Sequence, residues 1–303
     1  FTGLIGIFTL LGIAVLLSNN REKINLRTVF SGLALQFILA FFILGTSLGE
    51  PVFRALDNAI TTLVGFSDAG STFLFRSYIS GTYHPSLENF AFRTLPTIIF
   101  FSSLISVLYH FGIIQKIVKM FAKIFQKTMF ISGTESLSVS GNIFLGQTEA
   151  PLMVKPFVDK MTKSELMAVM TGGFATAAGG ILAIYVSWLS DIPGIAGHLL
   201  TASVMSAPAA LVMAKIIYPE VEESNTMGDL NIEIEQTTTN AMEALGNGAT
   251  TGLKLAANIA AMLIAFLSFV AMINYLLLFL GTSMEAIFGF LFKPLAWTMG
   301  VPW

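Results

Sequence analysis

The chain has 303 residues and a formal net charge of −2; 54% of its residues are hydrophobic and only 11% are charged. Soluble domains carry about 25% charged residues, so this composition, with a mean hydropathy of +0.77, indicates an integral membrane protein. The net charge argues against nucleic acid as a partner. The chain has no cysteine, which excludes a disulfide framework, and its three histidines are too scattered to predict a zinc site.

Three apolar runs of spanning length occur early in the chain, at residues 1–17, 28–49 and 94–115. The first run lacks a basic n-region and a small-residue cleavage site, so we interpret it as a spanning helix rather than a removed signal peptide. Arg21, Lys23 and Arg27 crowd the loop that follows it. Positive charge in short loops marks the cytoplasmic side, so the N-terminus is expected outside. Residues 1–115 are assigned to a scaffold of three transmembrane helices.

Residues 51–66 differ from these runs because they mix charged and apolar side chains. The apolar residues recur at helical spacing, at positions 56, 60, 63 and 64. This pattern predicts an amphipathic helix that lies in the membrane interface. A packed extracellular loop is the alternative.

Two basic clusters follow, formed by Lys116, Lys119, Lys123 and Lys127 and by Lys155, Lys160 and Lys163. Residues 128–154, between them, carry Glu135 and Glu149. A single span would place the clusters on opposite faces and would expose glutamates to lipid, at about +2.5 kcal/mol or more for each acidic group. A re-entrant helical hairpin within residues 116–162, with its turn near Gly141, avoids both problems. Glu135 is expected to be a hydrogen-bond partner within the packed hairpin.

Residues 164–190 have spanning length, but the central segment Thr171–Ile181 contains four glycines. Each glycine costs up to about 1 kcal/mol relative to alanine in a helix interior, so we predict a broken or closely packed helix. A tight helix contact without a ligand is the alternative. With the hairpin, this helix forms a transport part at residues 116–190.

The rest of the chain alternates apolar and polar segments. We predict a transmembrane helix at 195–217, an acidic cytoplasmic linker at 219–249, a long scaffold helix at 250–284 and the start of a second hairpin at 285–303.

Discontinuous helices that meet at the membrane midplane are how many transporters bind a solute and an ion together. The hairpin supplies Asn142, Gln147, Thr148 and Glu149, and the broken helix supplies Thr176. The neutral oxygens of Asn142 and Thr176 suit sodium, because a divalent ion would recruit more negative charge. Gln147 and Glu149 offer donors and acceptors for a polar, uncharged heterocyclic solute.

Residues 141–158 read GNIFLGQTEAPLMVKPFV and residues 163–183 read KSELMAVMTGGFATAAGGILA. These segments closely resemble the concentrative nucleoside transporters in their bacterial form, and residues 19–29 and 92–112 are similar to that family too. The resemblance implies an all-α, multi-span symporter with inverted repeats and elevator-type motion. It also implies a homotrimer in the bacterial inner membrane that imports uridine-like nucleosides with sodium or protons and uses no organic cofactor.

The resemblance also implies roles for single residues. The nucleoside site would include Gly146, and the nucleobase would face Gln147, Thr148 and Glu149. An apolar Ile181 would pack on the base. Sodium would bind the side-chain oxygens of Asn142 and Thr176 and the backbone carbonyls of Leu145, Thr176 and Ala177. The position that matches Thr176 is serine in other family members, and threonine here keeps the hydroxyl group. The second repeat, which holds the ribose, is expected to follow Trp303.

Alternatives remain beside the sodium-coupled symporter. A proton-coupled nucleoside symporter would use the same motif. An intramembrane enzyme would need a second acid or a nucleophile beside Glu149, and no such partner is evident, so we do not expect an enzyme. A passive channel lined by the same hairpin would differ in having no gradient requirement.

Overall fold

The computed structural model describes residues 2–77, 80–82, 84, 87, 89–147, 150–177, 179–227 and 238–302. Every regular element in these ranges is a helix, as the long apolar runs and the family resemblance predict. The chain divides into two compact units, a larger unit of residues 19–256 and a smaller unit of residues 1–18 and 257–303.

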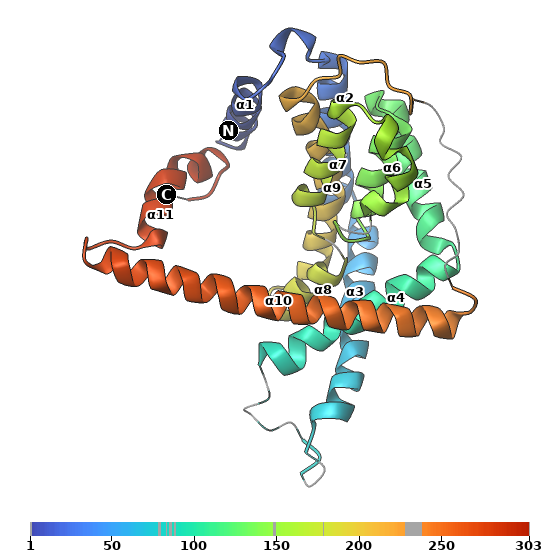
Figure 1. Cartoon of the computed structure of the whole chain (residues 1–303), viewed down its shortest axis with the longest axis vertical. Helices are drawn as coiled ribbons and strands as arrows, with labels where there is room; N and C mark the ends of the chain where they lie inside the picture. Colours follow the sequence, from blue (N-terminus) through green and yellow to red (C-terminus); the bar gives the residue numbers. More distant parts are fainter. Residues whose placement is uncertain are drawn as a thin grey trace. The chain divides into compact units, whose positions relative to one another are not determined.

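The larger unit contains most of the helices (Figure 1). They are α2 Leu26–Gly45, α3 Gly49–Phe75, α4 Leu95–His110, α5 Ile113–Met129, α6 Gly133–Asn142, α7 Lys163–Ala175, α8 Gly179–Trp188 and α9 Ile195–Ile217, with short helices at Arg21–Lys23, Phe90–Thr94 and Ala150–Lys160. Helix α10, Ala241–Leu278, begins in this unit and ends in the smaller one.

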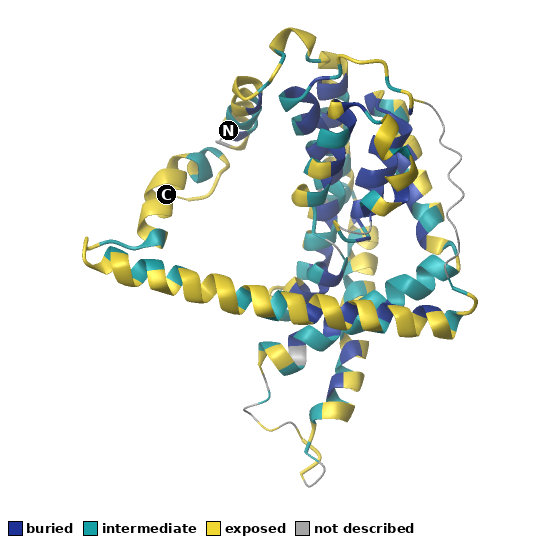
Figure 2. Ribbon diagram, in the orientation of Figure 1, coloured by how far each residue is buried: buried dark blue, intermediate teal, exposed yellow. Residues whose placement is uncertain are grey.

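The core of the larger unit lies around α6, α7 and α9, where Figure 2 shows most of the buried residues. Every residue of α6 is buried. One side of this core is covered by α5, whose residues Ile114, Val118 and Phe125 face inward. The lysines of α5 are exposed on its other face. This segregation of apolar and basic residues is why α5 packs beside the hairpin instead of crossing a bilayer alone.

Helix α3 extends the predicted amphipathic segment of residues 51–66 to Gly49–Phe75, and it is a helix rather than the alternative loop. Its Ile60 and Val64 pack against buried residues of α8 and α9. The Asp57 carboxylate accepts a hydrogen bond from the backbone N–H of Gly197 at 2.8 Å. The apolar spacing seen in the sequence therefore packs α3 on the protein core.

Five helical segments among the described residues are long and apolar enough to cross a membrane. They are Leu26–Ile43, Phe90–His110, Lys163–Trp188, Ile195–Ile217 and Ala241–Leu278, with a shorter apolar helix at Gly3–Leu16.

The last of these spans begins at Ala241, nine residues before the predicted start at residue 250, so residues 241–249 belong to the helix and not to the linker. Capping explains the difference, because Asn240 Oδ1 accepts the Glu243 N–H at 2.9 Å and Glu243 accepts the Thr239 N–H at 2.7 Å.

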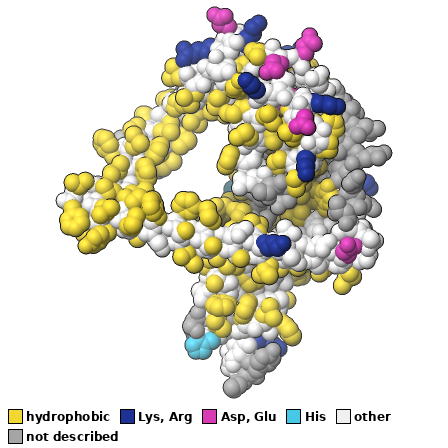
Figure 3. All heavy atoms as spheres, viewed as in Figure 1, with side chains coloured by type: hydrophobic (Ala, Val, Ile, Leu, Met, Phe, Trp, Pro, Cys, Tyr) yellow, Lys and Arg dark blue, Asp and Glu magenta, His cyan; other side chains and the backbone are white. Residues whose placement is uncertain are grey.

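The smaller unit contains α1 Thr2–Leu16, the later part of α10 and α11 Met284–Thr298. Gly6 of α1 lies against the backbone of Thr298, where an added Cβ would be 2.5 Å from the carbonyl oxygen. Asn274 holds the start of α11, because its side chain contacts Glu285 at 3.0 Å and the Met284 N–H at 2.8 Å. The surface of this unit that Figure 3 shows is largely hydrophobic, as a lipid-facing surface requires.

Candidate functional site

The predicted hairpin is a pair of arms that pack on each other. Its first arm is α6, and its second arm is the 3₁₀ helix Ala150–Lys160. Gly141 lets the arms approach closely, because a Cβ there would lie 3.0 Å from Met153 Sδ and 3.5 Å from Ala150 Cβ. The first arm continues through Asn142, so the turn lies after the position near Gly141 that the sequence suggested.

The hairpin begins and ends at the same end of the larger unit. Thr226 contacts the Thr134 hydroxyl, at the start of α6, at 2.9 Å and donates to the Glu165 carboxylate, at the start of α7. The chain therefore enters through α6 and returns before α7 starts.

The glycine-rich segment is a broken helix, as predicted. Helix α7 ends at Ala175, Thr176 adopts an extended conformation with φ −123° and ψ 149°, and α8 resumes at Gly179. The break frees the carbonyl oxygens of the last turn of α7 from intrahelical bonds.

The glycines also form close helix contacts, which were the predicted alternative to a broken helix. A Cβ added at Gly172 would lie 2.8 Å from Val139 Cγ2, and one at Gly173 would lie 3.4 Å from Gln147 Cβ. One at Gly179 would lie 3.1 Å from the carbonyl oxygen of Phe144. All three contacts are with the hairpin, so the break and the close packing belong to one site.

Asn142 and Thr176 meet at the ends of α6 and α7. The Asn142 side-chain amide donates to the Gly172 carbonyl oxygen at 2.6 Å and to the Thr176 hydroxyl. The Thr176 hydroxyl is also 3.2 Å from the Gly172 carbonyl oxygen. Asn142 is only 3% exposed. These contacts use the amide nitrogen of Asn142, so its oxygen is the atom that would face a cation.

The other residues predicted for the cation site lie in the same two elements. Leu145 is buried in the turn of the hairpin. The carbonyl oxygen of Ala177 accepts a long hydrogen bond from the Ser203 hydroxyl of α9, at 3.3 Å. A carbonyl oxygen has two lone pairs, so this bond leaves one available to a cation.

The residues predicted to bind the solute are only partly described. Gly146 and Gln147 lie in the turn, and Gln147 is exposed beside Gly173. Ile181 is half-buried on α8. Thr148 and Glu149 lie outside the described residues.

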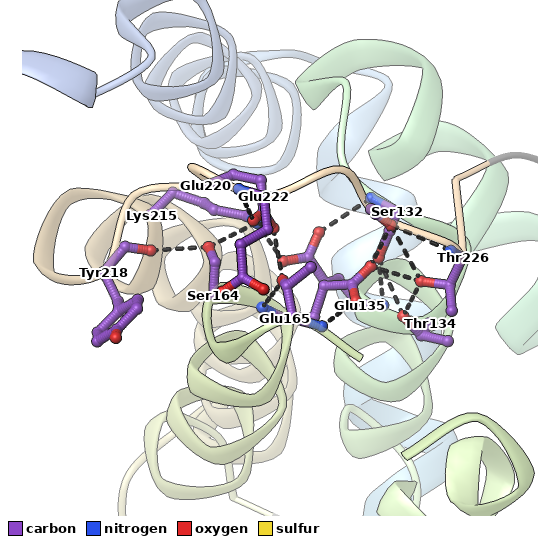
Figure 4. Close-up of polar contacts among 12 residues, drawn as sticks. Ser132, Thr134, Glu135, Ser164, Glu165, Lys215, Tyr218, Glu220, Glu222 and Thr226 are labelled. Atoms are coloured by element: carbon purple, nitrogen blue, oxygen red, sulfur yellow. Dashed lines mark hydrogen bonds and ion pairs between the residues drawn. The ribbon is translucent and has the colours of Figure 1, made fainter. Parts of the chain in front are cut away.

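A polar cluster at the other ends of α6 and α7 was not found by sequence reasoning (Figure 4). Its centre is Lys215, which lies 2.5 Å from the Glu135 carboxylate and donates to the Ser164 hydroxyl at 2.9 Å. Glu135 was expected to be a hydrogen-bond partner, but its ion pair with α9 was not. The signal that was available is a repeated capping box, Ser132 with Glu135 and Thr162 with Glu165.

Comparison with known proteins places these features in a family. The Na⁺-dependent nucleoside transporter profiles match residues 5–78 for the N-terminal part and 198–303 for the C-terminal part, and a nucleoside recognition (gate) profile matches residues 91–191. An uncharacterized transporter of Haemophilus influenzae is 40% identical over 99% of this chain and 72% of its own length. Sodium/nucleoside cotransporter 1 of Mus musculus is 41% identical over 94% of this chain but only 44% of its own length.

Solved structures of CNTnw have the same fold as this chain. The inward-facing, substrate-bound state of CNTnw superposes with a TM-score of 0.89 at 38% identity, covering all of this chain and 72% of that one. An outward-facing state of a CNTnw variant superposes with a TM-score of 0.90 over 74% of its chain. The family consists of multi-pass membrane cotransporters and not of enzymes. The profiles, the relatives and the fold together show that this chain belongs to the Na⁺-dependent nucleoside transporters, the concentrative nucleoside transporter family.

Proposed function

We propose that the protein is a symporter that imports nucleosides together with a cation, and that the cation is sodium. The observation that carries the proposal is the contact between Asn142 and Thr176, where α6, the first arm of the hairpin, and α7, the first half of the broken helix, both end inside the larger unit. Interrupted helices expose polar backbone only where it lines a binding site or is buried in protein. The relatives named sodium/nucleoside cotransporters support the same reading.

The ligand atoms at this site favour sodium. Asn142 and Thr176 offer neutral side-chain oxygens, and Leu145, Thr176 and Ala177 offer backbone carbonyls. No carboxylate belongs to this set, so its charge suits a weakly bound monovalent cation better than a divalent one. A proton would need a titratable group, and the set contains none.

For the nucleoside we assign Gln147, Thr148 and Glu149 to the base, with Gly146 as part of the same binding turn and Ile181 packing on the ring. Gln147 and Ile181 lie on the two elements that meet at Asn142 and Thr176. An amide and a carboxylate can satisfy both donors and acceptors of a uridine-like base. The solute and the cation would then share the hairpin and the broken helix, which is the arrangement that couples their binding.

The orientation follows from charge. Arg27 lies 3.5 Å from the ring centroid of Phe130, and the Asn19 N–H donates to the Ile217 carbonyl at 3.0 Å, so the first loop, the end of α5 and the end of α9 share one end. Charged side chains gather at that end in Figure 3. We assign it to the cytoplasm of a bacterial inner membrane, with the N-terminus outside. We also propose that the protein is a homotrimer whose transport part moves in an elevator-type motion.

The test is uptake of radiolabelled uridine into proteoliposomes that contain the full-length protein. An inward sodium gradient should drive accumulation above the external concentration, and a proton gradient without sodium should not. Accumulation on protons alone would keep nucleoside symport and overturn the ion assignment. Equilibration without any gradient would indicate a passive channel, and no uptake under either gradient would overturn the substrate class.

A further inference from the structure

Helices α6 and α7 run side by side between two polar groups of residues. Both start at the Lys215 cluster, defined here as Glu135, Glu165, Lys215, Glu220, Ser224 and Thr226, and both end at the Asn142–Thr176 site. Helix α6 has 10 residues and α7 has 13, which correspond to about 15 Å and about 20 Å of helix. The cluster is therefore too distant to touch a cation at Asn142.

Lys215 joins the starts of both helices through one ammonium group. It contacts the Glu135 carboxylate of α6 at 2.5 Å, the Ser164 hydroxyl of α7 at 2.9 Å and the Glu220 carboxylate after α9 at 3.5 Å. The side chain of Lys215 is 10% exposed and that of Glu135 is 1% exposed. Removing one partner of such a buried pair leaves the other charge uncompensated.

The segment that follows α9 closes over the same helix starts. Ser224 donates to Glu165 at 2.5 Å, and Thr226 donates to the same carboxylate oxygen. Thr226 also accepts the Gly133 N–H at 3.0 Å with its carbonyl oxygen. Thr226 is 1% exposed. The starts of α6 and α7 are thus bonded to each other through α9 and through this segment.

Between the two ends, α6 and α7 touch without spare room, because Val139 fills the space that a side chain at Gly172 would need. Two short, closely packed helices transmit a shift at one end to the other. We infer that Lys215 is a positioning residue for the cation site: by pairing with Glu135 and Ser164 it sets the axial register of α6 against α7 and so the separation of Asn142 from Thr176. This inference rests on the proposed function of that site.

The experiment measures cation binding without transport. Thermal unfolding of the purified full-length protein is followed against sodium concentration without nucleoside, since a cation that binds only the folded state stabilises it by an amount that grows with the logarithm of the ratio of sodium concentration to dissociation constant. The apparent dissociation constant for sodium, obtained by fitting this rise in melting temperature, is called the sodium midpoint below. Lys215→Met removes the charge and keeps an unbranched side chain that is one atom shorter. We expect the sodium midpoint of this variant to rise about 10- to 100-fold, the range for groups that orient metal ligands. Lys215→Arg should keep the midpoint within about threefold, because the charge remains.

Lys163→Met is the matched control, because Lys163 is an exposed lysine at the first residue of α7. Its midpoint should equal that of the wild type. Glu135→Gln is a second variant, for the case that Lys215→Met does not fold. The glutamine side-chain oxygen can still accept the hydrogen bond that the Ser132 N–H donates to Glu135 at 2.9 Å, so α6 keeps its cap. It should raise the sodium midpoint as Lys215→Met does.

A lower melting temperature with an unchanged sodium midpoint in both Lys215→Met and Glu135→Gln would overturn the positioning role and leave only a structural one. A wild-type protein with no sodium-dependent stabilisation would overturn the cation site itself, and this inference with it. In that case uridine uptake on a proton gradient would show that nucleoside transport survives.

Discussion

The side-chain amide of Asn142, at the end of α6, donates a hydrogen bond to the carbonyl oxygen of Gly172 in α7 over 2.6 Å. This bond is possible because Gly172 has no side chain to hold α6 away. Gly172 therefore lowers helix stability but lets α6 approach α7, so that the Asn142 amide reaches the Gly172 carbonyl oxygen near the end of α7.

Replacing Asn142 should separate cation binding from nucleoside binding. Asn142→Ala removes one proposed ligand, so we expect the apparent sodium affinity to fall at least about tenfold, or about 1.4 kcal/mol. The apparent nucleoside affinity at saturating sodium should change far less. Sodium titrations of uridine uptake measure both. Thr176→Ser, which keeps the hydroxyl, is the control and should behave like the wild type, and an unchanged sodium dependence in Asn142→Ala would remove the ion assignment.

Replacing Glu149 should give the opposite separation. Glu149→Gln removes the acceptor that we assign to the nucleobase, so uridine uptake should be abolished. Sodium-dependent thermal stabilisation should persist, because no proposed cation ligand is changed. Uptake at the wild-type rate would exclude Glu149 from the nucleoside site.

Gly172→Ala tests the close contact between the hairpin and the broken helix. The new Cβ would lie 2.8 Å from Val139 Cγ2, and such overpacking costs about 1–3 kcal/mol. We expect a lower melting temperature and weaker sodium stabilisation, and Val139→Ala in the same chain should restore part of both. Gly65→Ala is the control, because no atom lies within 4 Å of the added Cβ. Equal behaviour of the two alanine variants would contradict the packing.

Gly248→Ala tests how α10 packs on α4 within the larger unit. The added Cβ would lie 2.6 Å from the Cα of Ser103, which is a backbone atom and cannot rotate away as a side chain can. We expect a loss of about 1–3 kcal/mol, measured as a lower melting temperature. Gly246, in the same helix, has open space around its Cβ position.

Gly246→Ala should therefore be neutral or stabilising, because alanine favours a helix by about 1 kcal/mol relative to glycine. A melting temperature that falls equally in both variants would mean that α10 does not contact α4 through Gly248.

Much of the site could be predicted because its residues are unfavourable in an ordinary membrane-spanning helix. Glutamates and amides in an apolar chain cost free energy unless they line a site, and the four glycines of residues 171–181 weaken any continuous helix. A broken or closely packed helix in this segment follows from this reasoning, and the structure places the break between Ala175 and Gly179. The start of α10 was placed too late because its apolar run begins after its capping residues, Thr239 and Asn240.

The sequence by itself determined the membrane class, the all-helical fold and the two elements that carry the site, because each depends on side chains close together in the chain. Only the tertiary structure decided that the amide nitrogen of Asn142 is the atom that contacts Thr176, that Lys215 pairs with Glu135, and that Ser224 and Thr226 bond to Glu165 at the start of α7. The partners in these contacts are far apart in sequence. Their charges and hydroxyls could pair in many ways until the packing of α6, α7 and α9 brought these groups within bonding distance.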